Sequence, residues 1–176
     1  MIAEGQLVVA TRMSLLLVLA LTFQFSVASR LEVFGVQGDV MLLVAVAAGL
    51  AAGPDRGATL GFVAGLSFDL LLQSPFGLSA LTYALVAYAV GSLQDSVLRA
   101  AWWIPVVTAV TASAVGVILY GVFGTMVGEE DLLGLSLVRI ALVVGTLNAI
   151  AAPFVLRAVR WATGTSDNVR ARAMMR

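Results

Sequence analysis

The 176-residue sequence contains no cysteine, no histidine and no lysine. Without cysteine and histidine the chain cannot form a disulfide or use a thiol nucleophile or an imidazole base, and it lacks the usual zinc and haem ligands. Every positive charge is therefore an arginine, which we attribute to codon bias in a GC-rich genome. The net charge is zero, so the charge balance gives no support for nucleic-acid binding.

Charged residues are also scarce. They make up 11% of the chain, whereas 61% is hydrophobic and the mean hydropathy is +1.04. A soluble domain carries roughly 25% charged residues, so this composition indicates that lipid is the solvent. Because one spanning helix takes about 20 residues, the chain has room for six spans and short loops. The sequence therefore predicts an all-α integral membrane protein, a compact bundle of about six transmembrane helices.

Hydrophobic runs separated by turn residues predict where these spans lie. Gly53-Pro54 and Pro75-Phe76-Gly77 favour short turns, because proline fixes φ and glycine permits a left-handed conformation. The first run ends at residues 26–28 in small residues that a signal peptidase accepts, but an anchored helix is the favoured interpretation. Pro153 is expected to kink the last span or to relax its last turns. The predicted spans, within one domain of residues 1–163, are 13–29, 34–52, 58–73, 77–93, 101–123 and 138–158.

The arginines predict the orientation of the bundle. Eight of them fall on the side that holds both termini, and only Arg30 and Arg139 fall on the other. By the positive-inside rule, the N-terminus, the C-terminus and the polar, arginine-rich tail of residues 164–176 lie in the cytoplasm. Arginines near this end are candidate contacts for anionic lipid or a cytoplasmic protein. They are Arg157, Arg160, Arg170 and Arg172.

Asp69 is the most unusual residue inside the apolar runs. A carboxylate in a membrane helix costs about 2.5–3.5 kcal/mol on insertion scales, so it needs a partner, water or a proton. Gly61, Gly65 and Asp69 recur every four residues and share one helix stripe, where the glycines let a neighbouring backbone approach closely. Two interpretations stay open: an ion, proton or substrate site, or a packing residue that bonds to Ser67, Tyr83 or a backbone amide.

Asp39 and Asp69 together raise the question of an intramembrane aspartyl protease or a lipoprotein signal peptidase. Both enzymes need two carboxylates that meet at one water. Asp39 lies at the mouth of the second span, and the other residues that these enzymes require are missing. The acidic residues 129–131 supply too few oxygen ligands for calcium. We therefore expect no enzymatic activity, no metal and no cofactor.

The third and fourth spans carry a recognisable spacing of glycine, aspartate and proline. It resembles the central signature of the MreD family of rod shape-determining proteins, and chain length and span number are similar too. The likeness covers residues 61–91. The candidates for partner binding or helix packing are Gly61, Gly65, Asp69, Pro75, Phe76, Gly77, Tyr88 and Gly91.

This resemblance implies a non-enzymatic role in bacterial cell-wall elongation at the inner membrane. The implied partners are MreC above all, then MreB, RodA and a class B penicillin-binding transpeptidase. In this interpretation the bundle is a scaffold that binds the transmembrane helix of MreC, with Asp69 and the glycine stripe shaping the docking surface. The family also resembles the substrate-binding S-subunits of energy-coupling-factor transporters in fold. The alternative is therefore a vitamin-type transporter subunit with a ligand pocket near Asp69 and Gln73.

Overall fold

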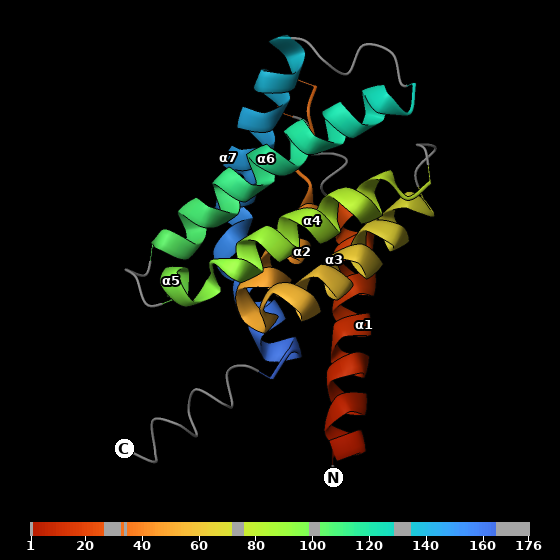
Figure 1. The fold of residues 1–176 in the computed structure, drawn as a ribbon, viewed down its shortest axis with the longest axis vertical. Coiled ribbons are helices and arrows are strands. Elements are labelled where there is room, and N and C mark those ends of the chain that lie inside the picture. Colours follow the sequence, from red (N-terminus) through yellow and green to blue (C-terminus); the bar gives the residue numbers. More distant parts are fainter. Residues whose placement is uncertain are drawn as a thin grey trace.

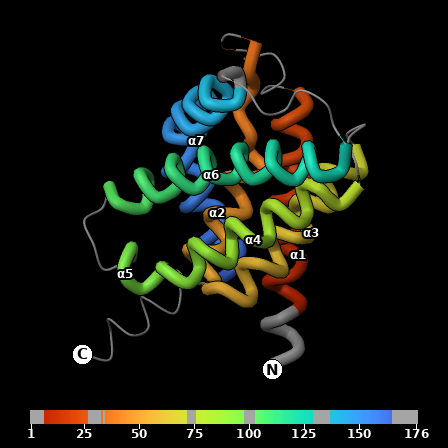
Figure 2. The backbone as a smooth tube through the Cα atoms, turned by 45° about the horizontal axis from the view of Figure 1, so that its top comes forward, coloured from red at the N-terminus to blue at the C-terminus, as the bar shows by residue number. Residues whose placement is uncertain are grey.

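The computed structural model describes residues 2–26, 33, 35–71, 76–98, 103–128 and 135–164, and these ranges are helical throughout apart from short turns. This confirms the predicted all-α fold class. Figures 1 and 2 show a bundle in which the helices cross at varied angles. The helices are α1 (Ile2–Ser26), α2 (Val40–Ala52), α3 (Pro54–Asp69), α4 (Leu78–Ser92), α5 (Gln94–Leu98), α6 (Ile104–Met126) and α7 (Leu135–Ala162).

Three of these helices contain segments long and apolar enough to cross a membrane. The segments are Leu7–Ser26, Ile104–Met126 and Leu137–Ala162, which belong to α1, α6 and α7. Helices α2 and α4 are apolar but shorter, with 13 and 15 residues. The number of spans therefore stays a prediction.

The helix ends differ from the predicted spans where local capping decides them. The second helix begins at Val40 and not near residue 34, because Gly35 has φ +74° and Asp39 forms the N-cap. Helix α3 begins at Pro54, since proline suits the first helical position. Helix α5 lies in the connection between the predicted spans 77–93 and 101–123. Helix α7 continues as one helix through Pro153.

Helix α2 forms the centre of the bundle. It contacts all six other helices of the described chain, and every residue from Val40 to Ala51 is buried. Figure 1 shows α3 and α4 crossing in front of it, with α7 on the far side. Glycine permits the closest of these approaches: a Cβ on Gly49 would lie 2.4 Å from the Ala87 carbonyl oxygen of α4, and a Cβ on Gly57 of α3 would lie 2.6 Å from the Gly49 Cα.

The start of α1 lies next to the end of α7. The guanidinium carbon of Arg12 is 5.0 Å from the ring centroid of Trp161, a cation–π contact. In Figure 1 both helix ends are at the same end of the molecule. Residues 129–131 and 165–176 lie outside the described residues, and with them most of the predicted tail.

Candidate functional site

The glycine stripe of α3 is covered by α4. A Cβ on Gly61 would lie 2.7 Å from the carbonyl oxygen of Tyr83, and a Cβ on Gly65 would lie 2.5 Å from the Cα of Ala80. Both glycines are buried. The two backbones touch here, so of the two roles considered for this stripe the geometry supports helix packing. In the structure α4 covers this stripe, where the sequence had led us to expect a docking surface for an MreC helix.

Asp69 joins the end of α3 to the start of α4. Its Oδ2 accepts hydrogen bonds from the Gly77 N–H at 3.0 Å and the Ala80 N–H at 3.2 Å, and its Oδ1 accepts one from the Ser79 N–H at 3.2 Å. These amides belong to the first turn of α4, where no intrahelical acceptor exists and the helix dipole favours an anion. Asp69 is 2% exposed. The sequence suggested Ser67, Tyr83 or a backbone amide as the partner of Asp69, and the structure shows backbone amides.

The turn before α4 depends on glycine as well as on Asp69. Gly77 has φ +96° and is the N-cap residue of α4. A left-handed φ is open to glycine at little energetic cost and is strained for most other residues. This conformation lets the Gly77 N–H point back to the Asp69 carboxylate. Residues 72–75, which include Pro75 and Gln73, lie outside the described residues.

A second polar cluster surrounds the start of α2. We call it the α2 hub: Gln24, Gly38, Asp39, Tyr83, Ser113 and Asn148. Gln24 of α1 donates from Nε2 to the Gly38 carbonyl and accepts from the Val40 N–H, both at 2.9 Å. Asp39 Oδ1 accepts from the Leu42 N–H at 2.8 Å. Its Oδ2 accepts from the Tyr83 hydroxyl at 2.6 Å.

Asn148 of α7 completes the α2 hub. Its Nδ2 donates to the Asp39 carbonyl at 3.0 Å and to the Ser113 Oγ on α6 at 2.9 Å. Asn148 and Ser113 are buried. Because Gln24, Tyr83, Ser113 and Asn148 come from α1, α4, α6 and α7, one short backbone segment ties four helices to the N-terminus of α2.

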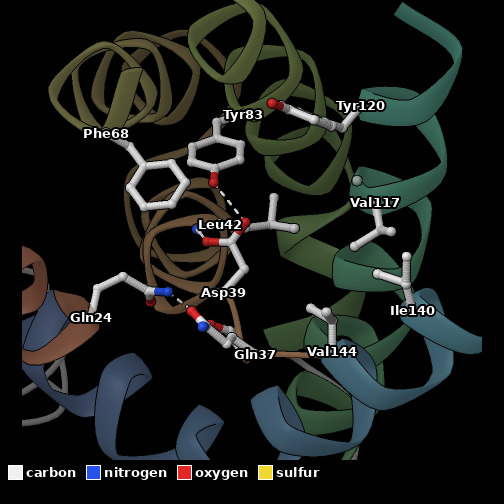
Figure 3. Close-up of a pocket in the computed structure, with 12 residues that line it drawn as sticks. Gln24, Gln37, Asp39, Leu42, Phe68, Tyr83, Val117, Tyr120, Ile140 and Val144 are labelled. Carbon is white, nitrogen blue, oxygen red and sulfur yellow. Dashed lines mark hydrogen bonds between the residues drawn. The ribbon is translucent and has the colours of Figure 1, made fainter. Parts of the chain in front are cut away.

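A pocket of about 260 Å³ opens beside the α2 hub. Figure 3 shows the Tyr83 hydroxyl directed at the Asp39 carboxylate at its centre, with Gln24 and Gln37 on one side and Tyr120 on another. Phe68 closes part of it, its ring centroid 6.3 Å from that of Tyr83. Pockets for small-molecule ligands usually measure about 300–1,000 Å³, so this one lies at the small end.

The two aspartates have separate structural partners. Asp69 does not line the pocket beside Asp39, and its oxygens bond to backbone amides of the α4 start. Asp39 instead bonds to Tyr83 and caps α2. Within the described ranges no group of three or more His, Cys, Asp or Glu side chains could hold a metal ion. The geometry assigns both carboxylates to helix connections.

The remaining sequence candidates divide by exposure. Gly91 is buried against the turn before α3. Phe76 and Tyr88, by contrast, are 67% and 50% exposed. Arg157 is exposed and Arg160 partly buried. Arg170 and Arg172 lie outside the described residues.

Sequence reasoning overlooked most of the α2 hub. Gln24 and Asn148 are amides within apolar runs, and a polar residue at such a position signals a buried hydrogen bond as clearly as Asp69 does. Tyr83 was considered a partner for Asp69, whereas it bonds to Asp39. The pairing could not be derived because it joins residues 44 positions apart.

Comparison with known proteins gives one finding. The family model described as rod shape-determining protein MreD matches residues 5–158. No match to the chain was found among curated proteins or among solved structures.

Proposed function

The chain belongs to the MreD family of rod shape-determining membrane proteins, and from this premise we propose that it is a non-enzymatic scaffold of the elongation complex that binds MreC. The match covers most of the chain, from residue 5 to residue 158. In this proposal the bundle holds MreC at the bacterial inner membrane and so helps to regulate peptidoglycan synthesis. MreB, RodA and a class B penicillin-binding transpeptidase are the further partners, and both termini face the cytoplasm.

One observation carries the proposal for the docking surface. The stretch that resembles the family uses its glycines and Asp69 inside the α3–α4 hairpin, but it also presents an apolar stripe outward. Leu81, Leu85 and Tyr88 of α4 are 48%, 43% and 50% exposed. Their i, i+4, i+7 spacing places them on one helix face. We call these three residues the α4 outer stripe.

The α4 outer stripe suits a transmembrane helix as partner. Helices associate in lipid through close side-chain packing, since lipid supplies no hydrophobic drive between them. A helix partner is recognised by anchors at this same spacing. The inner face of α4 is fixed to α3 by backbone contact and by Asp69, so the outer stripe is presented on a rigid element. A rigid surface loses little conformational entropy when it binds.

Co-purification with MreC tests this surface. Leu85→Ala combined with Tyr88→Ala is expected to abolish recovery of MreC from membranes, while the bundle keeps its helical content. The matched control is Val138→Ala with Leu142→Ala, which removes two exposed apolar side chains from α7. This control should recover MreC like the wild type. Equal recovery with all three proteins would show that MreC binds elsewhere.

The pocket beside the α2 hub favours a second, weaker candidate function, a small-molecule-binding subunit. The transporter interpretation placed its ligand near Asp69, but Asp69 does not line this pocket. The pocket is also small for a vitamin-sized ligand. Val117 lines the pocket, so the larger side chain of Val117→Phe would fill the pocket. Rod shape should persist in that variant if the protein is a scaffold, and fail if a ligand in the pocket is needed.

A further inference from the structure

An apolar groove of about 760 Å³ runs between α1 and α7 and reaches down to α2. The two helices contact each other and run in opposite directions (Figure 1). Apart from the Asn148 amide at its floor, which donates hydrogen bonds to the Asp39 carbonyl and the Ser113 hydroxyl, the side chains that line the groove are aliphatic or aromatic. They include Leu16, Leu19 and Phe23 on α1 and Ile150, Phe154 and Ala158 on α7.

Charged and aromatic residues gather at one end of this groove. Arg12 precedes Leu19 by seven residues and therefore lies on the groove side of α1. On α7, Arg157 and Trp161 follow Phe154 by three and seven residues, so both lie near the groove side. The Arg12 guanidinium packs over the Trp161 ring, and Arg157 is exposed. These three residues do not line the groove itself, but they lie within about one helix turn of its Leu16 and Ala158 end. Cations and an indole are the residue types that gather at membrane interfaces.

The size of the groove distinguishes between its two natural occupants. A helix about 10 Å wide that crosses a 30 Å hydrocarbon core occupies roughly 2,400 Å³. The groove is smaller than such a helix, so a helix could pack against it only with part of its surface. An acyl chain is far narrower than a helix and fits between the walls. A charged group at only one end also matches a lipid, which has one polar end.

We propose that this groove binds an anionic phospholipid, with one acyl chain along α1 and α7 and the phosphate held by Arg12 and Arg157. Arginine matches phosphate geometry because its planar guanidinium can donate two parallel hydrogen bonds. Trp161 then lies at the level of the headgroup. The proposal goes beyond the scaffold function, since it uses a face of the bundle remote in sequence from the α4 outer stripe.

Native mass spectrometry of the full chain in detergent, titrated with phosphatidylglycerol, tests the proposal. Arg12→Gln with Arg157→Gln should weaken phosphatidylglycerol binding about thirty-fold, as expected for two arginines near an anionic headgroup. Arg56→Gln is the matched control, because Arg56 is an exposed arginine of α3, a helix that contributes no residue to the groove. It should bind like the wild type. Ala158→Phe fills the groove and should remove binding.

The possible outcomes distinguish whether the arginine charges, the acyl chain or a protein helix determines what binds in the groove. Glycerol phosphate, which has the headgroup chemistry and no acyl chain, should not compete with the phospholipid. Unchanged affinity in the double arginine variant overturns the proposal, and so does effective competition by glycerol phosphate. Retained lipid together with loss of a co-purifying single-span protein in Ala158→Phe would assign the groove to a protein helix. Circular dichroism checks the fold of each variant, since Arg157 is exposed but Arg12 is partly buried and packs over Trp161.

Discussion

Replacing Asp69 should loosen the α3–α4 hairpin more than any other loss of one charge in the described chain. In Asp69→Ala the N–H groups of Gly77, Ser79 and Ala80 lose their shared acceptor. The bonds to Ser79 and Ala80 are buried, and an unsatisfied buried donor costs about 1–3 kcal/mol. Loss of an N-cap alone costs about 0.5–2 kcal/mol. We expect a loss of about 3–4 kcal/mol in the free energy of unfolding.

Asp69→Asn refines this expectation. Its single amide oxygen can keep the bonds to Gly77 and Ala80, because both amides share Oδ2 in the wild type. The negative charge at the start of α4 and the bond to Ser79 are lost. A charge-assisted bond is worth about 1.5–3 kcal/mol and a neutral one about 1 kcal/mol, so this variant should lose about 2 kcal/mol. The free energy of unfolding should therefore be lowest for Asp69→Ala, intermediate for Asp69→Asn and highest for the wild type.

Thermal unfolding in detergent, followed by circular dichroism, measures this ranking. For a chain of this size 1 kcal/mol shifts the midpoint by about 2–4 °C, so Asp69→Ala should melt roughly 10 °C below the wild type. Asp55→Ala is the control, since Asp55 is an exposed acid in the first turn of α3. It should lose no more than about 1 kcal/mol. If Asp69→Ala melts with the control yet fails to support rod shape, Asp69 acts on a partner or an ion and our structural assignment is wrong.

Two further substitutions test the helix contacts. Gly65→Ala should lower the free energy of unfolding by about 1–3 kcal/mol, because its Cβ meets the α4 backbone at 2.5 Å. The control Gly145→Ala should not lower it, because its Cβ finds ordinary contact at 3.4 Å. Equal unfolding midpoints for the two variants would contradict the close approach of α3 and α4. Tyr83→Phe removes the hydroxyl that donates to Asp39 and should lower the free energy of unfolding by about 1.5–3 kcal/mol. The control Tyr88→Phe changes an exposed tyrosine and should unfold like the wild type. A lower unfolding midpoint for Tyr88→Phe than for Tyr83→Phe would refute the role of Tyr83 in the α2 hub.

The parts of the fold that the sequence predicted are those that local chemistry decides. The turn at Gly53-Pro54 and the packing of Gly61 and Gly65 follow from proline, glycine and a four-residue spacing, all read within one or two helix turns. The family resemblance, now confirmed by the match to residues 5–158, rests on the same local signals. The glycine spacing predicts a close helix contact, and the structure has one between α3 and α4, but spacing does not say which helix covers the stripe.

What could not be predicted depends on contacts between distant segments. Asn148 reaches the Asp39 carbonyl across 109 positions and Gln24 reaches Gly38 across 14. No periodicity links such residues, so the α2 hub emerges only once the helices are placed. The start of α2 differs from the predicted span for a local reason. Hydropathy continues upstream of Val40, and the Asp39 cap, not the end of the apolar run, sets the boundary.

The shortness of α2 has a consequence for the depth at which polar groups lie. Thirteen residues of α-helix span only about 20 Å, whereas the hydrocarbon core is about 30 Å thick. If α2 lies within the hydrocarbon core, as the predicted spans place it, at least one of its ends does not reach the membrane surface. Backbone groups at that depth find no water, so protein must satisfy them. The amides of Gln24 and Asn148 take the place of water for Gly38, Asp39 and Val40, and they let a chain end a helix inside a bilayer.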